Sequence, residues 1–184
     1  MKLMWKIIKW FLIVWGAITF IATLFIGGCL FHSATLGNRP TNKLASKHDV
    51  RFVLNWCSLG ADRIEKVVHS YESARSFTGD HLDGHAIRVT HLDASELVYD
   101  EGKGGGGWYR GDALSGVAKD AVDFAAMWLG REEMSWFPTI DEIRSSEMYV
   151  YIWNVKYSGT RPNGTQIIFA NPTTKMIYYF SAKM

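Results

Sequence analysis

The chain has only two cysteines among its 184 residues, Cys29 and Cys57. Cys29 lies inside the longest apolar stretch of the sequence, far from Cys57, so we expect no intramolecular disulfide. Cys57 follows Trp56 in an apolar context, which favours a small buried side chain over a reactive thiol.

An excess of positive charge is also missing from most of the chain. Three of the 20 Lys and Arg residues, Lys2, Lys6 and Lys9, precede the apolar stretch, and the other 17 face 18 Asp and Glu residues, a net charge of −1. A nucleic-acid-binding domain needs a basic surface, because phosphate neutralisation supplies most of its affinity. We therefore predict no nucleic-acid partner.

The sequence also lacks a recognisable catalytic motif. There is no Gly-x-Ser-x-Gly elbow, and Lys103 precedes the glycines at 104–107, whereas the lysine of a phosphate-binding loop follows its glycines. Adjacent acids at 132–133 and 141–142 would point in different directions on a helix. We expect no cofactor and find no evident small-molecule substrate, so the sequence favours a binding protein over an enzyme.

What the sequence does contain is an uncharged apolar stretch at residues 10–31. About 20 apolar residues suffice for a helix to cross the hydrocarbon core of a membrane. The three lysines before this stretch favour a cytoplasmic N-terminus, which would place the rest of the chain on the extracytoplasmic, periplasmic side. Residues 1–31 are therefore predicted to be a membrane anchor or a signal segment.

The end of the stretch, Ile26-Gly27-Gly28-Cys29, resembles a bacterial lipobox. That resemblance implies cleavage before Cys29 and lipidation of its thiol. The apolar run is long for a signal peptide and continues through Leu30 and Phe31, which favours an uncleaved span. Either alternative tethers the protein to a membrane.

Residues 32–49 are mostly small and polar, which is typical of a flexible tether, and residues 50–184 are predicted to form one domain. Residues 50–57 alternate like a strand. Residues 61–77 have apolar side chains at helical spacing, and residues 85–92 read as a second strand.

Helical spacing returns after Asp112, a candidate cap, and ends at Gly130, while a capping-box pattern at Thr139 predicts another short helix. The last third predicts an antiparallel meander with strands at 149–157, 165–169 and 176–181. We predict an α+β fold, with a mostly antiparallel sheet of about five strands and two main helices covering one face.

Two groups of residues are candidate sites. His81, Asp83 and His85 could converge on a divalent metal, because imidazole and carboxylate suit zinc or a similar ion. A partner protein could bind the loop around 100–112 and the aromatic residues of the meander, because aromatic side chains are frequent interface anchors. The predicted contact residues are Lys103, Trp108, Tyr109, Arg110, Tyr151 and Trp153.

The sequence thus favours a membrane-tethered, extracytoplasmic protein-binding domain of a bacterial envelope. Periplasmic immunity or inhibitor proteins and envelope accessory lipoproteins resemble it in architecture alone. One alternative is a metal-dependent enzyme or metal-binding domain using the His81–His91 region. Another is a structural subunit of a membrane complex whose span docks through Trp5, Trp10 and Trp15.

Overall fold

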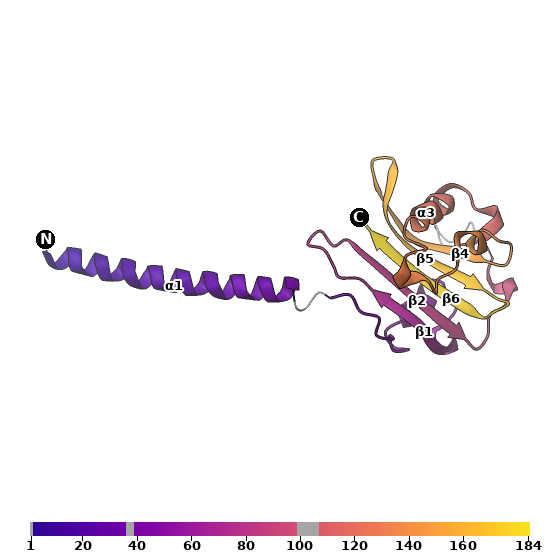
Figure 1. Cartoon of the computed structure of the whole chain (residues 1–184), viewed down its shortest axis with the longest axis horizontal. Coiled ribbons are helices and arrows are strands. Elements are labelled where there is room, and N and C mark those ends of the chain that lie inside the picture. Colours follow the sequence, from indigo (N-terminus) through magenta and orange to yellow (C-terminus); the bar gives the residue numbers. More distant parts are fainter. Residues whose placement is uncertain (1, 36–38, 99–106) are drawn as a thin grey trace. The chain divides into compact units, whose positions relative to one another are not determined.

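The computed structural model of the chain describes residues 2–35, 39–98 and 107–184 (Figure 1). It divides into two compact units, Met1–Arg39 and Pro40–Met184. The second unit begins ten residues before the domain boundary expected at residue 50, because Thr41 forms two backbone hydrogen bonds with Glu72.

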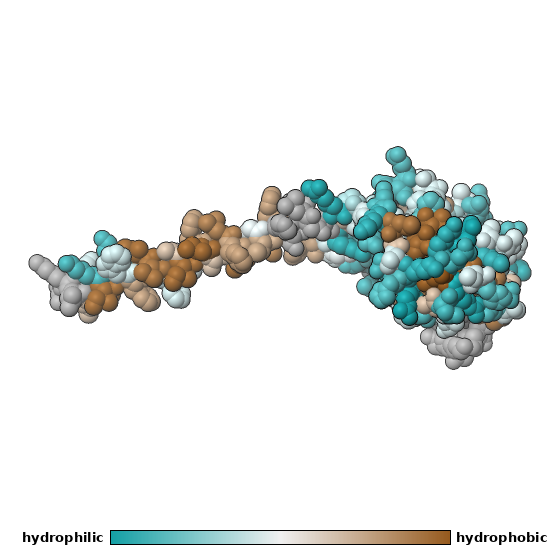
Figure 2. All heavy atoms as spheres, turned by 90° about the horizontal axis from the view of Figure 1, so that it is seen from below, coloured by the Kyte–Doolittle hydropathy of each residue, from teal (hydrophilic) through white to brown (hydrophobic). Residues whose placement is uncertain are grey.

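The first unit contains the helix α1, Lys2–Thr35. Its segment Met4–Phe31 is long and apolar enough to cross a membrane, and its described side chains are exposed (Figure 2). The predicted apolar N-terminal helix is confirmed, and its length and composition are consistent with membrane anchoring.

The second unit is built on one antiparallel sheet of six strands, in the order β1-β2-β6-β5-β4-β3. The α+β fold is confirmed, with six strands where about five were predicted, because the short β3 pairs with the start of β4. The strands are β1 (Ile64–Glu72), β2 (His81–Val89), β3 (Trp108–Arg110), β4 (Tyr149–Ser158), β5 (Arg161–Asn171) and β6 (Met176–Lys183).

Helices cover both faces of this sheet, whereas the sequence predicted helices on one face. The helices α3 (Gly116–Ala126) and α4 (Ile140–Ile143) cover one face, where Phe169 and Phe180 are fully buried. The helix α2 (Arg51–Trp56) covers part of the other face, over Ile87 and Ile177. Four short 3-10 turns complete the described part of the unit: Ala61–Arg63, Ala94–Glu96, Gly111–Ala113 and Glu132–Met134.

Two predicted elements have the wrong type. The strand predicted at 50–57 is the helix α2, because side chains at positions 53, 54 and 57 point together into the core. The helix predicted at 61–77 is the strand β1, in which two register shifts imitate a helical spacing. Cys57, as expected, is buried, and burial raises the pKa of its thiol to about 12.

The later elements follow the sequence more closely. The antiparallel meander of β4, β5 and β6 is confirmed. The main helix, predicted after Asp112, begins only at Gly116, since Asp112 lies in a 3-10 turn that precedes it. The capping box at Thr139 is confirmed, with the Thr139 hydroxyl oxygen accepting a hydrogen bond from the backbone N–H of Glu142.

Candidate functional site

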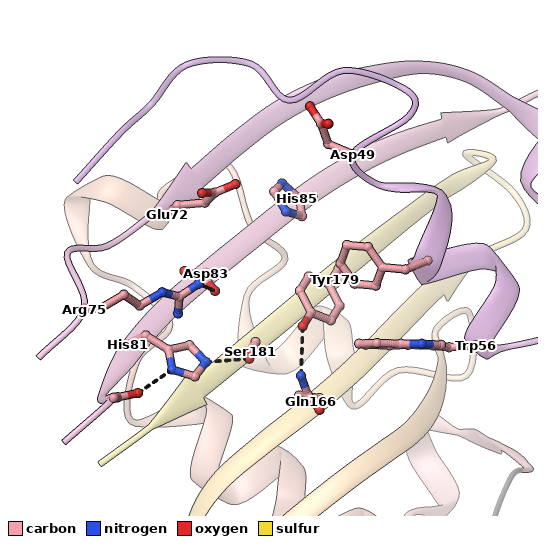
Figure 3. Close-up of a pocket in the computed structure, with 12 residues that line it drawn as sticks. Asp49, Trp56, Glu72, Arg75, His81, Asp83, His85, Gln166, Tyr179 and Ser181 are labelled. Carbon is pink, nitrogen blue, oxygen red and sulfur yellow. Dashed lines mark hydrogen bonds and ion pairs between the residues drawn. The ribbon is translucent and has the colours of Figure 1, made fainter. Parts of the chain in front are cut away.

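The face of the sheet that α2 covers changes from apolar to polar along its strands. On β2, Ile87 lies in the core, while His85, Asp83 and His81 continue the same face toward the start of the strand. Because α2 does not extend over these residues, they line an open cleft of about 570 Å³ (Figure 3). The lining residues of this cleft, called here the His81–His85 cleft, are Asp49, Phe52, Trp56, Glu72, Arg75, Gly79, His81, Asp83, His85, Gln166, Tyr179 and Ser181.

Asp83 forms an ion pair in the floor of the cleft. Its Oδ2 atom lies 2.7 Å from Nη2 of Arg75, which is carried by the loop between β1 and β2. The Asp83 side chain is 10 % exposed, and its buried Oδ1 atom has no hydrogen-bond partner among the described residues. A buried carboxylate oxygen without a partner is unusual in a folded protein, and this oxygen can accept a further hydrogen bond.

His85 lies deeper in the same floor. Its Nδ1 atom is 3.1 Å from Oγ of Ser70, which also accepts the backbone N–H of Ala45. Burial lowers the pKa of His85, so the neutral imidazole is favoured. Ser70 can then donate its proton to Nδ1, which leaves the ring proton on Nε2 as a donor.

His81 is oriented by contacts on both ring nitrogens. Its Nδ1 atom lies 2.9 Å from the carbonyl oxygen of Gly79, and because a carbonyl can only accept, Nδ1 donates. Its Nε2 atom lies 2.9 Å from Oγ of Ser181 (Figure 3). Both nitrogens are thus engaged by protein atoms.

The predicted metal ligands therefore share one cleft, and the metal site stays a prediction. His81, Asp83 and His85 alternate along one face of β2, but a metal would compete with Gly79 and Ser181 for His81 and with Arg75 for Asp83. In the described parts of the chain, the three side chains do not bring their ligand atoms within 4.8 Å of one another.

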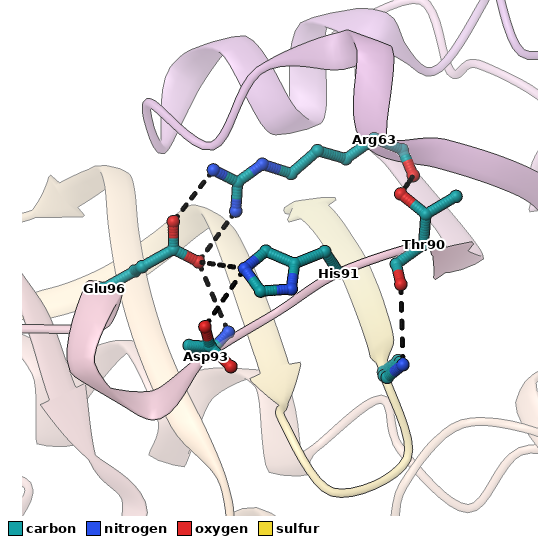
Figure 4. A network of polar contacts seen from close by, with 6 residues as sticks. Arg63, Thr90, His91, Asp93 and Glu96 are labelled. Carbon is teal, nitrogen blue, oxygen red and sulfur yellow. Dashed lines mark hydrogen bonds and ion pairs between the residues drawn. The ribbon is translucent and has the colours of Figure 1, made fainter.

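A different group meets that distance, namely His91, Asp93 and Glu96 (Figure 4). These residues are exposed or half-buried, and other contacts account for their positions. Glu96 receives two hydrogen bonds from Arg63, at 2.7 and 2.8 Å, and forms a capping box with Asp93. The guanidinium already supplies the positive charge that a metal would bring, so this group is a structural ion-pair network.

Aromatic side chains form one wall of the cleft. Phe52 and Trp56 of α2 contact each other edge to face at 4.6 Å, and Phe52 meets Tyr179 at 5.1 Å. Trp153 stacks in parallel on Trp56 with ring centroids 4.7 Å apart, and 45 % of Trp153 is exposed. The stack extends the aromatic wall from the cleft to the surface.

The other predicted contact residues have varied positions. Trp108 and Tyr151 are buried in the core beside α2, Tyr109 is half-buried, and the exposed Arg110 pairs with Asp112. Lys103 lies outside the described residues. Cys29, the predicted lipidation site, lies on the described part of α1 and is exposed. Among the predicted contact residues that the structure describes, only Trp153 belongs to the surroundings of the cleft.

Sequence reasoning missed most of the cleft. Ser181 and Tyr179 reach it because β6 pairs with β2, with Asp83 opposite Ser181 and His85 opposite Tyr179. Glu72 and Asp49 border it from the end of β1 and from the turn before α2 (Figure 3). The alternation of polar residues at 81, 83 and 85 was a sequence signal for the cleft residues of β2. The pairing of β2 with β6 could not be identified from local sequence pattern.

The cleft is better suited to binding than to nucleophilic catalysis. Ser181 pairs with His81 and Ser70 with His85, but the two serines are only 1 % and 6 % exposed. A nucleophile must reach its substrate, and these hydroxyls lie in the floor of the sheet. The exposed groups of the cleft are instead the carboxylates of Asp49 and Glu72 and the guanidinium of Arg75.

Comparison of the chain with models of protein families, with curated proteins and with solved structures finds no match in any of the three.

Proposed function

We propose that this chain is a membrane-anchored protein whose α+β domain lies on the extracytoplasmic side and binds another protein through the His81–His85 cleft. The length and composition of α1 support the anchor, and the lysines at positions 2, 6 and 9 support a cytoplasmic N-terminus. An immunity or inhibitor protein, or an accessory protein of the bacterial envelope, is the class that fits this arrangement.

The observation that carries the proposal is the composition of the cleft. Its floor holds a carboxylate and an imidazole from two buried residues, Asp83 and His85, and its wall is aromatic. Binding sites typically combine a concave apolar surface with a few convergent polar groups, and Trp, Tyr and Arg dominate interface energetics. The cleft has each of these features.

The charge of the cleft indicates which part of a partner would enter it. Arg75 is paired with Asp83, and His85 is held neutral by burial, so the carboxylates of Asp49 and Glu72 give the mouth a negative charge. A Lys or Arg side chain of the partner complements this charge and can also contact the aromatic wall. The proposed occupant is therefore a basic segment of a protein.

Photo-crosslinking of the full chain in membranes tests this proposal. A benzophenone amino acid is placed at Trp153, beside the cleft, and in a second protein at Thr173, an exposed residue in the turn between β5 and β6. We expect a discrete protein adduct from position 153 that is absent from position 173. The adduct should disappear when Glu72→Lys reverses the charge at the mouth, and should persist with Glu147→Lys, an exposed control.

Equal labelling from positions 153 and 173, or an adduct that survives Glu72→Lys, would contradict the proposed site. The same preparations test the anchor, because the protein should sediment with membranes at high salt and be released by detergent. Recovery in the soluble fraction would contradict membrane anchoring independently of the crosslinks.

A further inference from the structure

One end of the sheet carries an exposed phenylalanine. Phe77, in the loop that joins β1 to β2, is fully exposed, although burying such a side chain stabilises a protein by about 1.5–3 kcal/mol. Tyr157 and Met184, which are also substantially exposed, lie at the same end of the domain, where β4 and β6 finish. We call this end of the sheet, with the loop at 73–80, the Phe77 end (Figure 1).

The Phe77 end also carries three cations, interspersed with carboxylates. Lys183 lies opposite His81, where β2 begins, and its Nζ atom donates to the carbonyl oxygen of Thr78, one residue from Phe77. Lys156 and Arg161 lie nearby on the hairpin of β4 and β5. Carboxylates lie at this end as well, namely those of Glu72, Asp80 and Asp120. Asp80 accepts a hydrogen bond from the hydroxyl of Thr78, and Asp120 accepts one from the hydroxyl of Tyr157.

The connection to α1 reaches the domain at this same end. Thr41 forms an isolated bridge with Glu72, the last residue of β1. Thr41 follows Phe31, the last residue of the candidate span, by ten positions, and ten residues reach at most about 36 Å. A domain held by α1 in a bilayer therefore keeps its Phe77 end within reach of the lipid headgroups.

We infer that the Phe77 end docks on the surface of a bilayer that contains anionic phospholipids. Phe77 inserts among the headgroups, as aromatic side chains do at membrane interfaces, and Lys156, Arg161 and Lys183 face the phosphates. The inference rests on the membrane anchoring proposed above, and it places the His81–His85 cleft, which shares Arg75 and Gly79 with this loop, close to the lipid surface.

Lipid contact can be measured on the full chain with a fluorescent label. In a Cys29→Ala background, Ala74→Cys places an environment-sensitive nitrobenzoxadiazole label in the loop at 73–80, where Ala74 is exposed. Thr173→Cys places the same label at the opposite end of the sheet. Both proteins are reconstituted in phosphatidylcholine vesicles with and without phosphatidylglycerol, and quenching by spin-labelled lipid is recorded.

We expect a blue-shifted label at position 74 that spin-labelled lipid quenches in vesicles containing phosphatidylglycerol, and an unquenched label at position 173. Phe77→Asp should abolish the quenching. The double change Lys156→Glu and Arg161→Glu should lower the docked-to-undocked ratio at least about fivefold, because each cation near an anionic surface contributes to docking. High salt should have the same effect.

Equal quenching at positions 74 and 173, or quenching that Phe77→Asp leaves unchanged, would overturn the inference. Flotation of the same vesicles separates this result from failure of the anchor. Protein that floats with the vesicles but shows no quenching at position 74 refutes docking alone, whereas protein that does not float refutes the anchor and the docking together.

Discussion

Gly111 illustrates how a single residue allows two segments to pack together. It lies in the 3-10 turn before α3, and its backbone N–H donates to the carbonyl oxygen of Met148 at 2.7 Å. A Cβ atom at this position would overlap the backbone carbonyl oxygens of Ile143 and Ser145. Backbone atoms cannot move aside as the end of a side chain can, so this position requires glycine.

We therefore expect Gly111→Ala to lower the free energy of unfolding by about 3 kcal/mol or to prevent folding. Gly84→Ala is the matched control, because its Cβ would meet the side-chain ends of Met134 and Trp136 rather than backbone atoms, and we expect a loss below about 1.5 kcal/mol. Urea unfolding of the full chain in detergent, followed by tryptophan fluorescence, measures both values. Equal losses for the two variants would contradict this account.

Glu96 makes the stability of the domain depend on acidity. The two hydrogen bonds from Arg63 lower the pKa of Glu96 from 4.5 to about 2. A carboxyl group with a lowered pKa in the folded state contributes stability above its unfolded pKa, and this contribution is lost as the pH falls from about 4.5 to about 2. The pair is about one-third exposed, so we expect about 1 kcal/mol, as for a well-formed surface pair.

Unfolding measured between neutral and acidic pH checks this expectation. Glu96→Gln should lower the free energy of unfolding at neutral pH and should flatten its decline over the acidic range. Glu147→Gln, at an exposed position, should leave both unchanged. A Glu96→Gln protein with the native acid dependence would show that other carboxylates are responsible.

At the scale of elements, local pattern failed in two places for identifiable physical reasons. In β1, the register shifts between Ile64 and Lys66 and between Val67 and His69 insert extra residues into the strand. The buried positions therefore fall at 64, 67, 70 and 71, a spacing typical of a helix. Residues 51–56 are too few for the sequence to distinguish the 3.6-residue period of a helix from the two-residue period of a strand. Packing against the sheet therefore decides that this segment is helical.

The centre of the candidate site was more accessible to prediction than its surroundings. The sequence grouped His81, Asp83 and His85 as residues that could converge, although it predicted a strand only from residue 85. In the structure β2 begins at His81, so all three lie on one strand and line one cleft, and the metal site stays a prediction. The strand expected at 85–92 ends at Val89, so His91 lies beyond β2. The cleft residues of β6 include Ser181, which lies 100 residues after His81, and a non-local pairing of this kind leaves no trace in local spacing.

The capping box of α4 is an element that the sequence predicted and that mutation can test. The Thr139 hydroxyl accepts the backbone N–H of Glu142, and the Glu142 carboxylate accepts the backbone N–H of Thr139 at 2.7 Å. We expect Thr139→Ala to lower the free energy of unfolding by about 1 kcal/mol. Ser115→Ala is the control, since Ser115 precedes α3 without a capping hydrogen bond from its side chain, and should change little. Urea titration measures the free energy of unfolding of both variants. Equal losses in Thr139→Ala and Ser115→Ala would contradict the capping role of Thr139.

At the scale of the whole molecule, the N-terminal segment decides how the domain is held. If α1 is the anchor, its apolar length supplies the membrane affinity and Cys29 is dispensable. If the resemblance of residues 26–29 to a lipobox reflects processing, the mature protein begins at a lipidated Cys29 and lacks most of α1. The two alternatives predict different masses for the native protein.

We expect the native protein and Cys29→Ala alike to stay in the membrane fraction with the mass of the uncleaved chain. Ile18→Lys, near the middle of the candidate span Met4–Phe31, should impair insertion, because a lysine at the centre of a span costs about 3 kcal/mol. Membrane fractionation and intact-mass spectrometry measure both variants. A diacylated or triacylated Cys29 at the N-terminus of the native protein would instead establish a lipoprotein, because lipid chains would then replace the apolar helix as the source of membrane affinity.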